Sequence, residues 1–422
     1  MKVLVVGGGG REHALVRALR RSPQQPEVLC TPGNPGIARE AQTFDVGVDD
    51  VNAIADLVER EDVDLTVVGP EAPLVAGLVD ALQARGRAAF GPTRAAARLE
   101  GSKAYAKEVM AAAGVPTAAW TPVDDVEAGM AAIDRYPVVL KFDGLAAGKG
   151  VVIAEDEATA RRTLHEFLVE QRFGAGSVVV EEHLVGEELS LLALCDGETA
   201  VAMAPAQDYK RIFDGDLGPN TGGMGSYSPV AGVDDDLVAE IARTVHQPVV
   251  DELRHRGTPF HGILYAGIML TAEGPRVLEF NTRFGDPETQ AVLPRLRSDL
   301  VELLVRASTP EGLRGAVLEW DPRWAVSVVL ASAGYPESPS TGDAIAGLEE
   351  PPPDGVEVTH AGTAARPNGA IVTSGGRVLN VTALGDGPGA ARDAAYAAAE
   401  LITFEGRQLR RDIALRAVER TG

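Results

Sequence analysis

The stretch VVLKFDGLAAGKGVVIA, residues 138–154, places a glycine-rich loop between two short apolar segments. Residues 138–141 and 151–154 are too short for helices and rich in valine, which favours two β-strands. The loop, residues 144–150, contains Lys149, and Lys141 stands just before it. A flexible loop over a β-hairpin that carries two lysines suits a lid over a polyphosphate. The alternative, a mobile surface hairpin, leaves both lysines unexplained.

This loop is not a phosphate-binding loop of the Walker A type. Three residues separate Gly144 from Gly148 where that motif has four, and Gly150 stands where a Ser or Thr would bind magnesium. The loop also joins a strand to a strand, whereas a Walker A loop joins a strand to a helix. The lid interpretation therefore does not depend on a Walker motif.

Residues 1 to about 100 alternate apolar strands with helices. Strands are expected at residues 3–6, 28–31 and 65–68, and helices at residues 11–20 and around residues 56–59. Continuous apolar strands that alternate with helices indicate a parallel sheet covered on both faces. We therefore expect a Rossmann-like domain at the N-terminus.

The turn Gly7-Gly8-Gly9-Gly10 follows the first strand and invites comparison with a dinucleotide-binding motif. The spacing fails, because Glu12 stands where the third glycine belongs, and the second strand ends without an acidic residue for a ribose. Two interpretations stay open. The turn amides and the helix N-terminus can hold an anion, or a tight turn needs glycine only for its backbone angles.

The pattern of elements changes after residue 100. Ser102 is suited to cap a helix that stops at Gly114. Further strands are expected at residues 178–182, 189–194, 263–270, 277–281, 326–330 and 377–382, and an alanine-rich helix at residues 390–401. The chain is therefore expected to be an α/β and α+β multidomain protein. The predicted domains are residues 1–100, residues 101–322 with a lid subdomain at about 120–188, and a small β/α domain at residues 323–422.

Composition excludes several classes of protein. The 61 acidic and 39 basic residues give a net charge of −22, which argues against nucleic acid as a partner. No run approaches the ~18 apolar residues of a membrane-spanning helix, and the N-terminus is a strand, not a secretory signal. Two cysteines, Cys30 and Cys195, cannot build a disulfide framework or a four-cysteine zinc site. A reduced, cytoplasmic location without a membrane partner is expected.

The basic residues divide unevenly into 33 arginines and 6 lysines. Five of the lysines fall between residues 103 and 210, namely Lys103, Lys107, Lys141, Lys149 and Lys210. In a chain that otherwise uses arginine, these positions can require a compact point charge. Chance clustering or local packing is the alternative.

The stretch VLEFNTR, residues 277–283, is a strand by pattern. Alternate residues of a strand share a face, so Glu279, Asn281 and Arg283 project together while Leu278 and Phe280 face the core. A carboxylate and an amide oxygen suit Mg²⁺, and the Arg283 fork can hold a carboxylate or phosphate. A solvated polar face is the alternative, but the turn that follows adds two carboxylates, Asp286 and Glu288.

These pieces resemble the ATP-grasp superfamily. Within it, eight ordered motifs resemble the phosphoribosylamine–glycine ligase (glycinamide ribonucleotide synthetase) family of purine biosynthesis. They are residues 7–15 (GGGGREHAL), 32–36 (PGNPG), 68–73 (VGPEAP), 100–107 (EGSKAYAK), 141–150 (KFDGLAAGKG), 207–211 (QDYKR), 218–229 (GPNTGGMGSYSP) and 279–290 (EFNTRFGDPETQ). The likeness continues to residues 360–363 and 380–385, so it spans nearly the whole chain.

The resemblance implies a nucleotide-binding and metal-binding site with ATP and Mg²⁺, or Mn²⁺ in its place. Its ATP-binding residues are Lys103, Lys141, Gly148, Lys149, Gly150, Glu181, Glu182, Leu184 and Glu188, of which Glu181, Glu182 and Leu184 meet adenine and Glu188 meets the ribose. Glu279 and Asn281 hold the metal. Lys210, with Asp208 nearby, reaches the transferred phosphate. Gly10, Arg11 and Glu71 face the phosphoribosylamine.

The implied activity is that of a ligase. Transfer of the γ-phosphoryl group of ATP to glycine gives glycyl phosphate, which the 1-amino group of 5-phosphoribosylamine attacks. Catalysis of this kind depends on positioning and charge neutralisation rather than on a covalent nucleophile. Arg283 is expected to hold the glycine carboxylate and then the acyl phosphate. Asp286 is expected to orient the amine or accept its proton.

Some positions depart from the family pattern, and two other functions stay open. Phe142, Tyr209 and Thr282 replace a small residue, a His and a Cys, which puts the pocket shape in doubt. Residues 265–268 offer no second metal carboxylate, so metal binding must depend on Glu279 and the phosphates. The alternatives are an ATP-grasp ligase for a different acid and a nucleotide-binding regulatory module without turnover. A monomer is expected.

Overall fold

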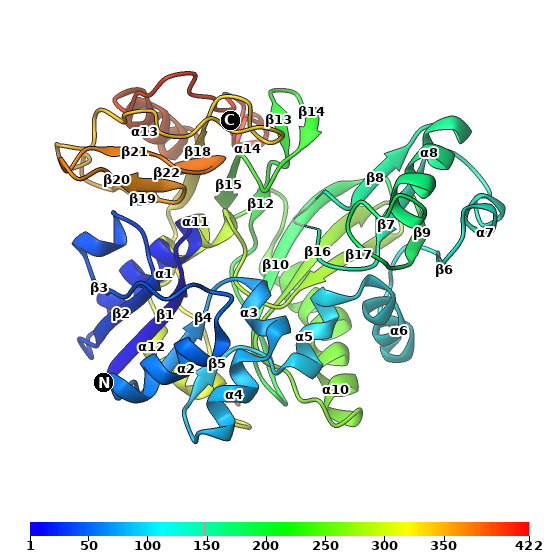
Figure 1. The fold of residues 1–422 in the computed structure, drawn as a ribbon, viewed down its shortest axis with the longest axis horizontal. Coiled ribbons are helices and arrows are strands. Elements are labelled where there is room, and N and C mark those ends of the chain that lie inside the picture. Colours follow the sequence, from blue (N-terminus) through cyan, green and yellow to red (C-terminus); the bar gives the residue numbers. More distant parts are fainter. Residues whose placement is uncertain (147–148, 422) are drawn as a thin grey trace.

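The computed structural model describes residues 1–146 and 149–421 (Figure 1). Its N-terminal part contains the predicted parallel sheet, five-stranded in the order β3-β2-β1-β4-β5. The strands are β1 (Lys2–Gly7), β2 (Glu27–Pro32), β3 (Gln42–Thr43), β4 (Leu65–Val68) and β5 (Ala89–Phe90). The helices are α1 (Gly10–Arg20), α2 (Val51–Arg60), α3 (Glu71–Ala76), α4 (Leu78–Ala84) and α5 (Arg94–Gly101), with a short turn η1 (Ile37–Arg39).

Both faces of this sheet are buried, which explains why its central strand is apolar without interruption. Val3 and Val5 of β1 belong to the core that includes α1, whereas Leu4 and Val6 belong to the core that includes α2 and α4. All four side chains are fully buried. The prediction of a parallel sheet covered on both faces is therefore confirmed.

The glycine turn after β1 is shaped by close backbone approach. A Cβ on Gly8 would lie 2.5 Å from the carbonyl oxygen of Gly33, in the loop that follows β2. The carboxylate of Glu12 turns back into the same region, where Oε2 accepts from the Gly9 amide at 2.7 Å. The Gly9 amide therefore already donates to Glu12 and is not free to bind an external anion. This favours the tight-turn interpretation for this part of the loop.

The middle of the chain first builds an antiparallel four-stranded sheet in the order β6-β9-β7-β8. Its strands are β6 (Trp120–Val123), β7 (Val138–Phe142), β8 (Val151–Ala154) and β9 (Val178–Glu182). The predicted lysine-bearing hairpin is the β7–β8 pair, in which Lys141 faces Val151. Helices α7 (Val126–Ala131) and α8 (Glu157–Leu168) pack on this lid sheet, at the right of Figure 1.

A second sheet, in the order β11-β10-β16-β17, lies at the centre of the molecule. Its strands are β10 (Glu187–Asp196), β11 (Ala200–Ala202), β16 (His261–Thr271) and β17 (Gly274–Asn281). Helices α6 (Lys103–Ala113), α9 (Asp235–Ile241) and α10 (Gln247–His255) pack near it, with a π-helical turn η2 (Ala242–His246). As predicted, the Ser102 hydroxyl caps α6 by accepting from the Tyr105 amide, and Gly114 ends it in a left-handed conformation with φ 68°.

The C-terminal sheet, in the order β12-β15-β18-β22-β19, takes strands from two parts of the chain. β12 (Gln207–Asp208) and β15 (Gly225–Ser228) come from the middle, whereas β18 (Trp324–Ala331), β19 (Val356–His360) and β22 (Arg377–Gly385) follow residue 322. The predicted domain limits stay predictions, and this sheet joins segments from both sides of the second limit. Two residues of the middle segment, Asp208 and Lys210, are thereby placed beside the C-terminal part.

The remaining elements are small. They are the hairpin β13 (Arg211–Phe213) and β14 (Leu217–Asn220), the pair β20 (Thr363–Ala365) and β21 (Ile371–Thr373), and the helices α11 (Glu288–Val292), η3 (Leu293–Arg295), α12 (Leu300–Ala307), α13 (Pro388–Glu400) and α14 (Leu415–Thr421). Among residues 1–146 and 149–421, no helix has both the length and the apolar character needed to cross a membrane.

We predict that Gly8→Ala destabilises the fold by about 1–3 kcal/mol, because its Cβ forces apart the loops after β1 and β2. The free energy of unfolding by urea measures this effect. Gly47→Ala is the matched control, since a Cβ there meets no heavy atom within 4 Å. Equal unfolding free energies for the two variants would contradict the close-approach explanation.

Candidate active site

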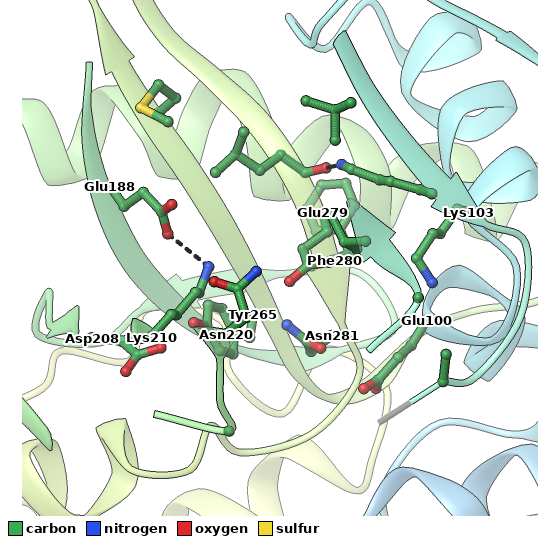
Figure 2. Close-up of a pocket in the computed structure, with 18 of the residues that line it drawn as sticks. Glu100, Lys103, Glu188, Asp208, Lys210, Asn220, Tyr265, Glu279, Phe280 and Asn281 are labelled. Carbon is green, nitrogen blue, oxygen red and sulfur yellow. Dashed lines mark hydrogen bonds and ion pairs between the residues drawn. The ribbon is translucent and has the colours of Figure 1, made fainter. Parts of the chain in front are cut away.

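The elements described above enclose a cleft of about 820 Å³. The N-terminal part, the lid sheet, the central sheet and the C-terminal part all contribute residues to its walls. Figure 2 shows part of this cleft. The residues that the sequence predicted and that line the cleft are Arg11, Glu71, Lys103, Lys141, Gly150, Glu181, Glu182, Leu184, Glu188, Asp208, Lys210, Glu279, Asn281, Arg283 and Asp286. Residues far apart in the sequence thus form one site.

Two predicted site residues in the described part of the chain, Gly10 and Lys149, do not belong to this wall. Gly10 lies at the start of α1, where a Cβ would meet the side chains of Asn380 and Gln290, so it is packed against protein. Lys149 is exposed in the loop before β8 and is not part of the cleft wall. Gly148 lies outside the described residues.

Strand β17 carries the acidic and amide side chains, but it has a β-bulge. Gly267 of β16 pairs with Glu279, and the next residue, Ile268, pairs with Val277, so Leu278 is an extra residue. The expectation that Leu278 faces the core is therefore wrong: Val277 is buried there, and Leu278 lines the cleft. Phe280 is buried as expected.

Glu279 lies among positive charges. Burial alone would raise the pKa of this carboxyl, but the charges of Lys210, Lys141 and Lys103, in that order, outweigh burial and lower the pKa below its ordinary value. Glu279 is therefore an anion at neutral pH, and Figure 2 shows it with Asn281 and Lys103 in the same cavity. Of the five lysines that lie between residues 103 and 210, four line this cleft: Lys103, Lys107, Lys141 and Lys210.

A buried ion-pair triad connects β9 to α6 and β7. Oε2 of Glu181 lies 2.9 Å from Nζ of Lys107 and 3.0 Å from Nζ of Lys141. Lys141 also donates to the carbonyl of Leu278 at 2.8 Å. Burial is the main cause that lowers the pKa of Lys107 to about 8. An ammonium has three donors, so Lys141 retains one for a ligand.

Arg283 is held by two carboxylates. Its Nε lies 3.3 Å from Glu71, and its Nη2 lies 3.1 Å from Glu100. Further hydrogen bonds go to the Asn281 side chain and to the Phe284 carbonyl. Three of its five N–H donors make hydrogen bonds, at Nε, Nη1 and Nη2, while the Glu100 contact is an ion pair; one N–H at Nη1 and one at Nη2 make no hydrogen bond to a described residue. Glu100 is fixed in turn, because its Oε2 accepts from both the amide and the hydroxyl of Thr282.

The other predicted catalytic residues are also engaged. Nζ of Lys210 donates to Oε2 of Glu188 at 2.7 Å, the contact drawn as a dashed line in Figure 2. Asp286 pairs with Arg377 at 3.1 Å and accepts from Gln290 at 2.8 Å. Burial opposes the ionised form of Asp286, but Arg377 and Arg11 lower its pKa below the ordinary value. Asp286 is therefore an anion held in place.

Sequence reasoning missed the cleft residues Glu100, Tyr265 and Arg377, and it noted Lys107 and Glu288 without giving either of them a role in the site. Glu100 and Lys107 lie within the quoted motif EGSKAYAK, and Glu288 within FGDPETQ, so motif membership could have identified them. Arg377 begins β22, 91 residues after Asp286, and no local pattern marks it.

A lid hairpin, β7–β8, lies at the cleft, lysines surround Glu279 and Asn281 of β17, and the fold is mixed α/β. These features together define an ATP-grasp enzyme. The fold agrees with this class. The biotin carboxylase domain of 2-oxoglutarate carboxylase from Hydrogenobacter thermophilus superposes with a TM-score of 0.73 at 18% identity, over 100% of this chain and 94% of that chain. At that identity, the likeness concerns the fold alone.

The particular family follows from closer matches. Residues 1–100, 101–289 and 325–416 match the N domain, the ATP-grasp (A) domain and the C domain of phosphoribosylglycinamide synthetase. The chain belongs to the phosphoribosylglycinamide synthetase family of ATP-grasp ligases.

Similar proteins span the whole chain. Phosphoribosylamine–glycine ligase of Streptomyces coelicolor is 51% identical over 99% of this chain and 99% of its own. The ligase of the same name from Ralstonia nicotianae is 48% identical over 100% of both chains. The crystal structure of phosphoribosylamine–glycine ligase from Thermotoga maritima superposes with a TM-score of 0.85 at 35% identity, over 98% of this chain and 100% of that chain.

We predict that Glu181→Gln destabilises the protein by about 3–5 kcal/mol, because it leaves Lys107 and Lys141 as buried charges without their shared anion. The neighbouring substitution Glu182→Gln removes a carboxylate that is paired with more exposed arginines, and it should cost about 1 kcal/mol or less. Urea unfolding of both variants measures the difference. If Glu181→Gln unfolds at the same urea concentration as the wild type, the triad does not stabilise the fold.

Proposed function

We propose that this chain ligates glycine to 5-phosphoribosylamine with ATP, through glycyl phosphate, to give glycinamide ribonucleotide, ADP and phosphate in purine biosynthesis. The observation that carries the proposal is the cleft itself, in which Lys103, Lys141 and Lys210 surround the Glu279–Asn281 strand. The family membership and the names of the similar proteins support the same reaction.

The chemistry explains why such a cleft suits the reaction. A carboxylate does not react with an amine at neutral pH, because an oxide is a poor leaving group. Phosphorylation turns that oxygen into a good leaving group, and the amine then displaces phosphate. Both steps move negative charge between oxygens, so preorganised cations supply most of the catalysis.

We assign the phosphate end of the cleft to Lys103, Lys141 and Lys210, each a point charge that a phosphate oxygen can approach from several directions. Gly148, Lys149 and Gly150 close over the phosphates from the lid. The acyl phosphate hydrolyses easily, so a closed lid also protects it from water.

The donors of β17 fit a divalent metal. Glu279 supplies an ionised carboxylate, and Asn281 supplies an amide oxygen, which are hard ligands. Among residues 1–146 and 149–421, no group of three or more His, Cys, Asp or Glu side chains is placed to hold a metal by itself. We propose Mg²⁺, or Mn²⁺ in its place, held by Glu279, Asn281 and the nucleotide; when bound, it neutralises charge on the phosphate oxygens.

We assign the nucleoside end to the hinge after β9. Glu181, Glu182 and Leu184 line the cleft there and are proposed to meet adenine. Glu188 is proposed to bind the ribose. Since Glu188 already pairs with Lys210 at 2.7 Å, ribose binding and Lys210 position would be coupled.

We assign the amine substrate to Arg11, Glu71 and Asp286, which line the cleft, with Gly10 next to Arg11 at the start of α1. Asp208, which lines the cleft near Lys210, is also assigned to substrate binding. We propose that Arg283 uses an N–H that makes no hydrogen bond to a described residue on the glycine carboxylate, and that Glu71 and Glu100 hold its guanidinium in place. Because Asp286 is ion-paired with Arg377, we propose that it orients the amine.

The decisive experiment is ADP release that depends on both substrates. We expect the purified chain to release one ADP for each glycinamide ribonucleotide, and only when glycine and 5-phosphoribosylamine are both present. Turnover with another acid in place of glycine would indicate a different ATP-grasp ligase. Nucleotide binding without any acid-dependent turnover would indicate a regulatory module.

We predict that Glu279→Gln lowers kcat on the order of 10²-fold or more, because it removes a preorganised charge, while the protein stays folded. Initial rates at saturating Mg²⁺ measure the effect. Glu273→Gln is the control, since that side chain is 79% exposed at the β16–β17 turn. Wild-type rates for Glu279→Gln would exclude Glu279 from the site.

We predict that Asp286→Asn spares glycyl phosphate formation but slows its capture, because the variant no longer orients the amine. ATP hydrolysis should then exceed glycinamide ribonucleotide formation severalfold, as measured by parallel ADP and product assays. A variant that keeps one ADP per product at the normal rate would show that Asp286 only holds the turn beside Arg377.

The remaining expectations concern context. We propose that the chain acts as a monomer in the cytoplasm on small molecules alone, without nucleic-acid or membrane partners. We also propose domains at residues 1–100, 101–322 and 323–422. Sedimentation equilibrium of the purified chain tests the monomer.

A further inference from the structure

Most carboxylates that line the cleft are paired with a basic side chain within 4 Å. Examples are Glu181 with two lysines and Asp286 with Arg377. Across the described part of the chain, three cleft carboxylates have no such pair: Glu279, Asp208 and Glu288. Glu279 lies in the field of the lysines. Asp208 and Glu288 remain without an assigned partner.

Asp208 is half-buried, and one of its oxygens is buried without a hydrogen-bond partner among the described residues. Among the described residues, Oδ1 of Asp208 finds no donor although solvent does not reach it. The space beside this oxygen is tight, because a Cβ on Gly223 would lie 2.7 Å from it. Burial, and then the charge of Glu288, raise the pKa of Asp208 well above its ordinary value. The two carboxyl groups therefore oppose each other's charge when no ligand is present.

Glu288 is fixed by neutral donors from the central sheet. It is 2% exposed, and its Oε1 accepts from the hydroxyl of Tyr265 at 2.5 Å and from that of Ser190 at 3.2 Å. Its second oxygen, Oε2, has no hydrogen bond to any described residue. A Cβ on Gly285 would lie 2.4 Å from that oxygen, so glycine at position 285 keeps the carboxylate in place. The side chain is thus positioned at the start of α11 with one oxygen unused.

A buried carboxylate without a cation is costly, and a cationic ligand relieves that cost. The lysines around Glu279 make their part of the cleft suited to phosphate groups and to a substrate carboxylate. A ligand that carries an ammonium a few ångströms from a carboxylate would satisfy both sides at once. The substrate class with this chemistry is a small α-amino acid.

We propose that Asp208 and Glu288 together form the subsite for the ammonium group of the amino-acid substrate. This inference rests on the proposed function and specifies how its acid substrate is recognised. The two carboxylates act as binding groups, and Tyr265 and Ser190 position Glu288. No further covalent step is involved.

The subsite has a chemical consequence for selectivity. An ammonium held between carboxylates keeps its proton, so its nitrogen has no lone pair for attack. Glycine bound in this way cannot act as the nucleophile toward an activated carboxyl group. The amine of the second substrate then acts as the nucleophile. Carboxylic acids that lack an ammonium group bind poorly, because Asp208 and Glu288 stay unpaired.

The test uses the full chain with Glu288→Gln and Asp208→Asn. We expect each variant to raise the KM for glycine at least about 30-fold, the effect of removing one partner of a buried charge pair, with the KM for ATP changed less than about twofold. We also expect the wild type to discriminate strongly against glycolate, which has a hydroxyl in place of the ammonium, and each variant to lose at least about tenfold of that discrimination.

Glu187→Gln is the matched control. This carboxylate also lines the cleft, but it pairs with Arg420 at the rim, so its loss should leave the KM for glycine unchanged. Melting temperatures confirm that each variant is folded. Glu288→Gln is nearly isosteric and keeps an oxygen for Tyr265 and Ser190, so it provides the test if Asp208→Asn does not fold.

The outcomes are distinguishable. Folded variants with an unchanged KM for glycine, or with a lower kcat at unchanged KM, would overturn the ammonium subsite while product formation by the wild type still supports the proposed function. If the wild type forms no glycinamide ribonucleotide, the proposed function itself fails.

Discussion

The balance of buried charge around Glu279 is the interaction on which the rest of this cleft depends. Glu279 stays ionised because lysines from three different elements surround it: Lys103 from α6, Lys141 from β7 and Lys210 from the segment after β12. Those lysines in turn need anions, and Glu181 and Glu188 supply them. Charges that would each be costly in isolation stabilise one another as a network.

The same rule organises the end of the cleft opposite the lid. Arg283 lies between Glu71 and Glu100, and Arg377 of the C-terminal part pairs with Asp286. Further polar contacts connect the N-terminal and C-terminal parts of the chain. The amide of Asn34 donates to the His360 carbonyl at 2.8 Å, and the backbone N–H of His360 donates to Nδ1 of His13 at 2.9 Å. In a chain with a net charge of −22, anionic ligands must be held by local positive charge, and four of the six lysines line this cleft.

The comparison of sequence with structure is most informative at individual residues. The buried strand β1 and the Ser102-capped helix follow from local pattern, and both were predictable. The orientation of Leu278 was not, because one extra residue at the bulge shifts the alternation of side chains by one. The engagement of Glu181 with Lys107 was not predictable either, since these residues lie 74 positions apart and meet only when β9 packs beside α6.

By itself, the sequence determined the order of strands and helices, the lysine-bearing hairpin and the motifs that place this chain among ATP-grasp ligases, because these depend on residue type, periodicity and spacing along the chain. Only the tertiary structure decided which charges are paired and which are free. It placed Arg377 against Asp286 and left Asp208 and Glu288 without an ion-pair partner among the described residues. The physical reason is that electrostatic energy depends on distance and burial, and both arise only when distant segments pack together.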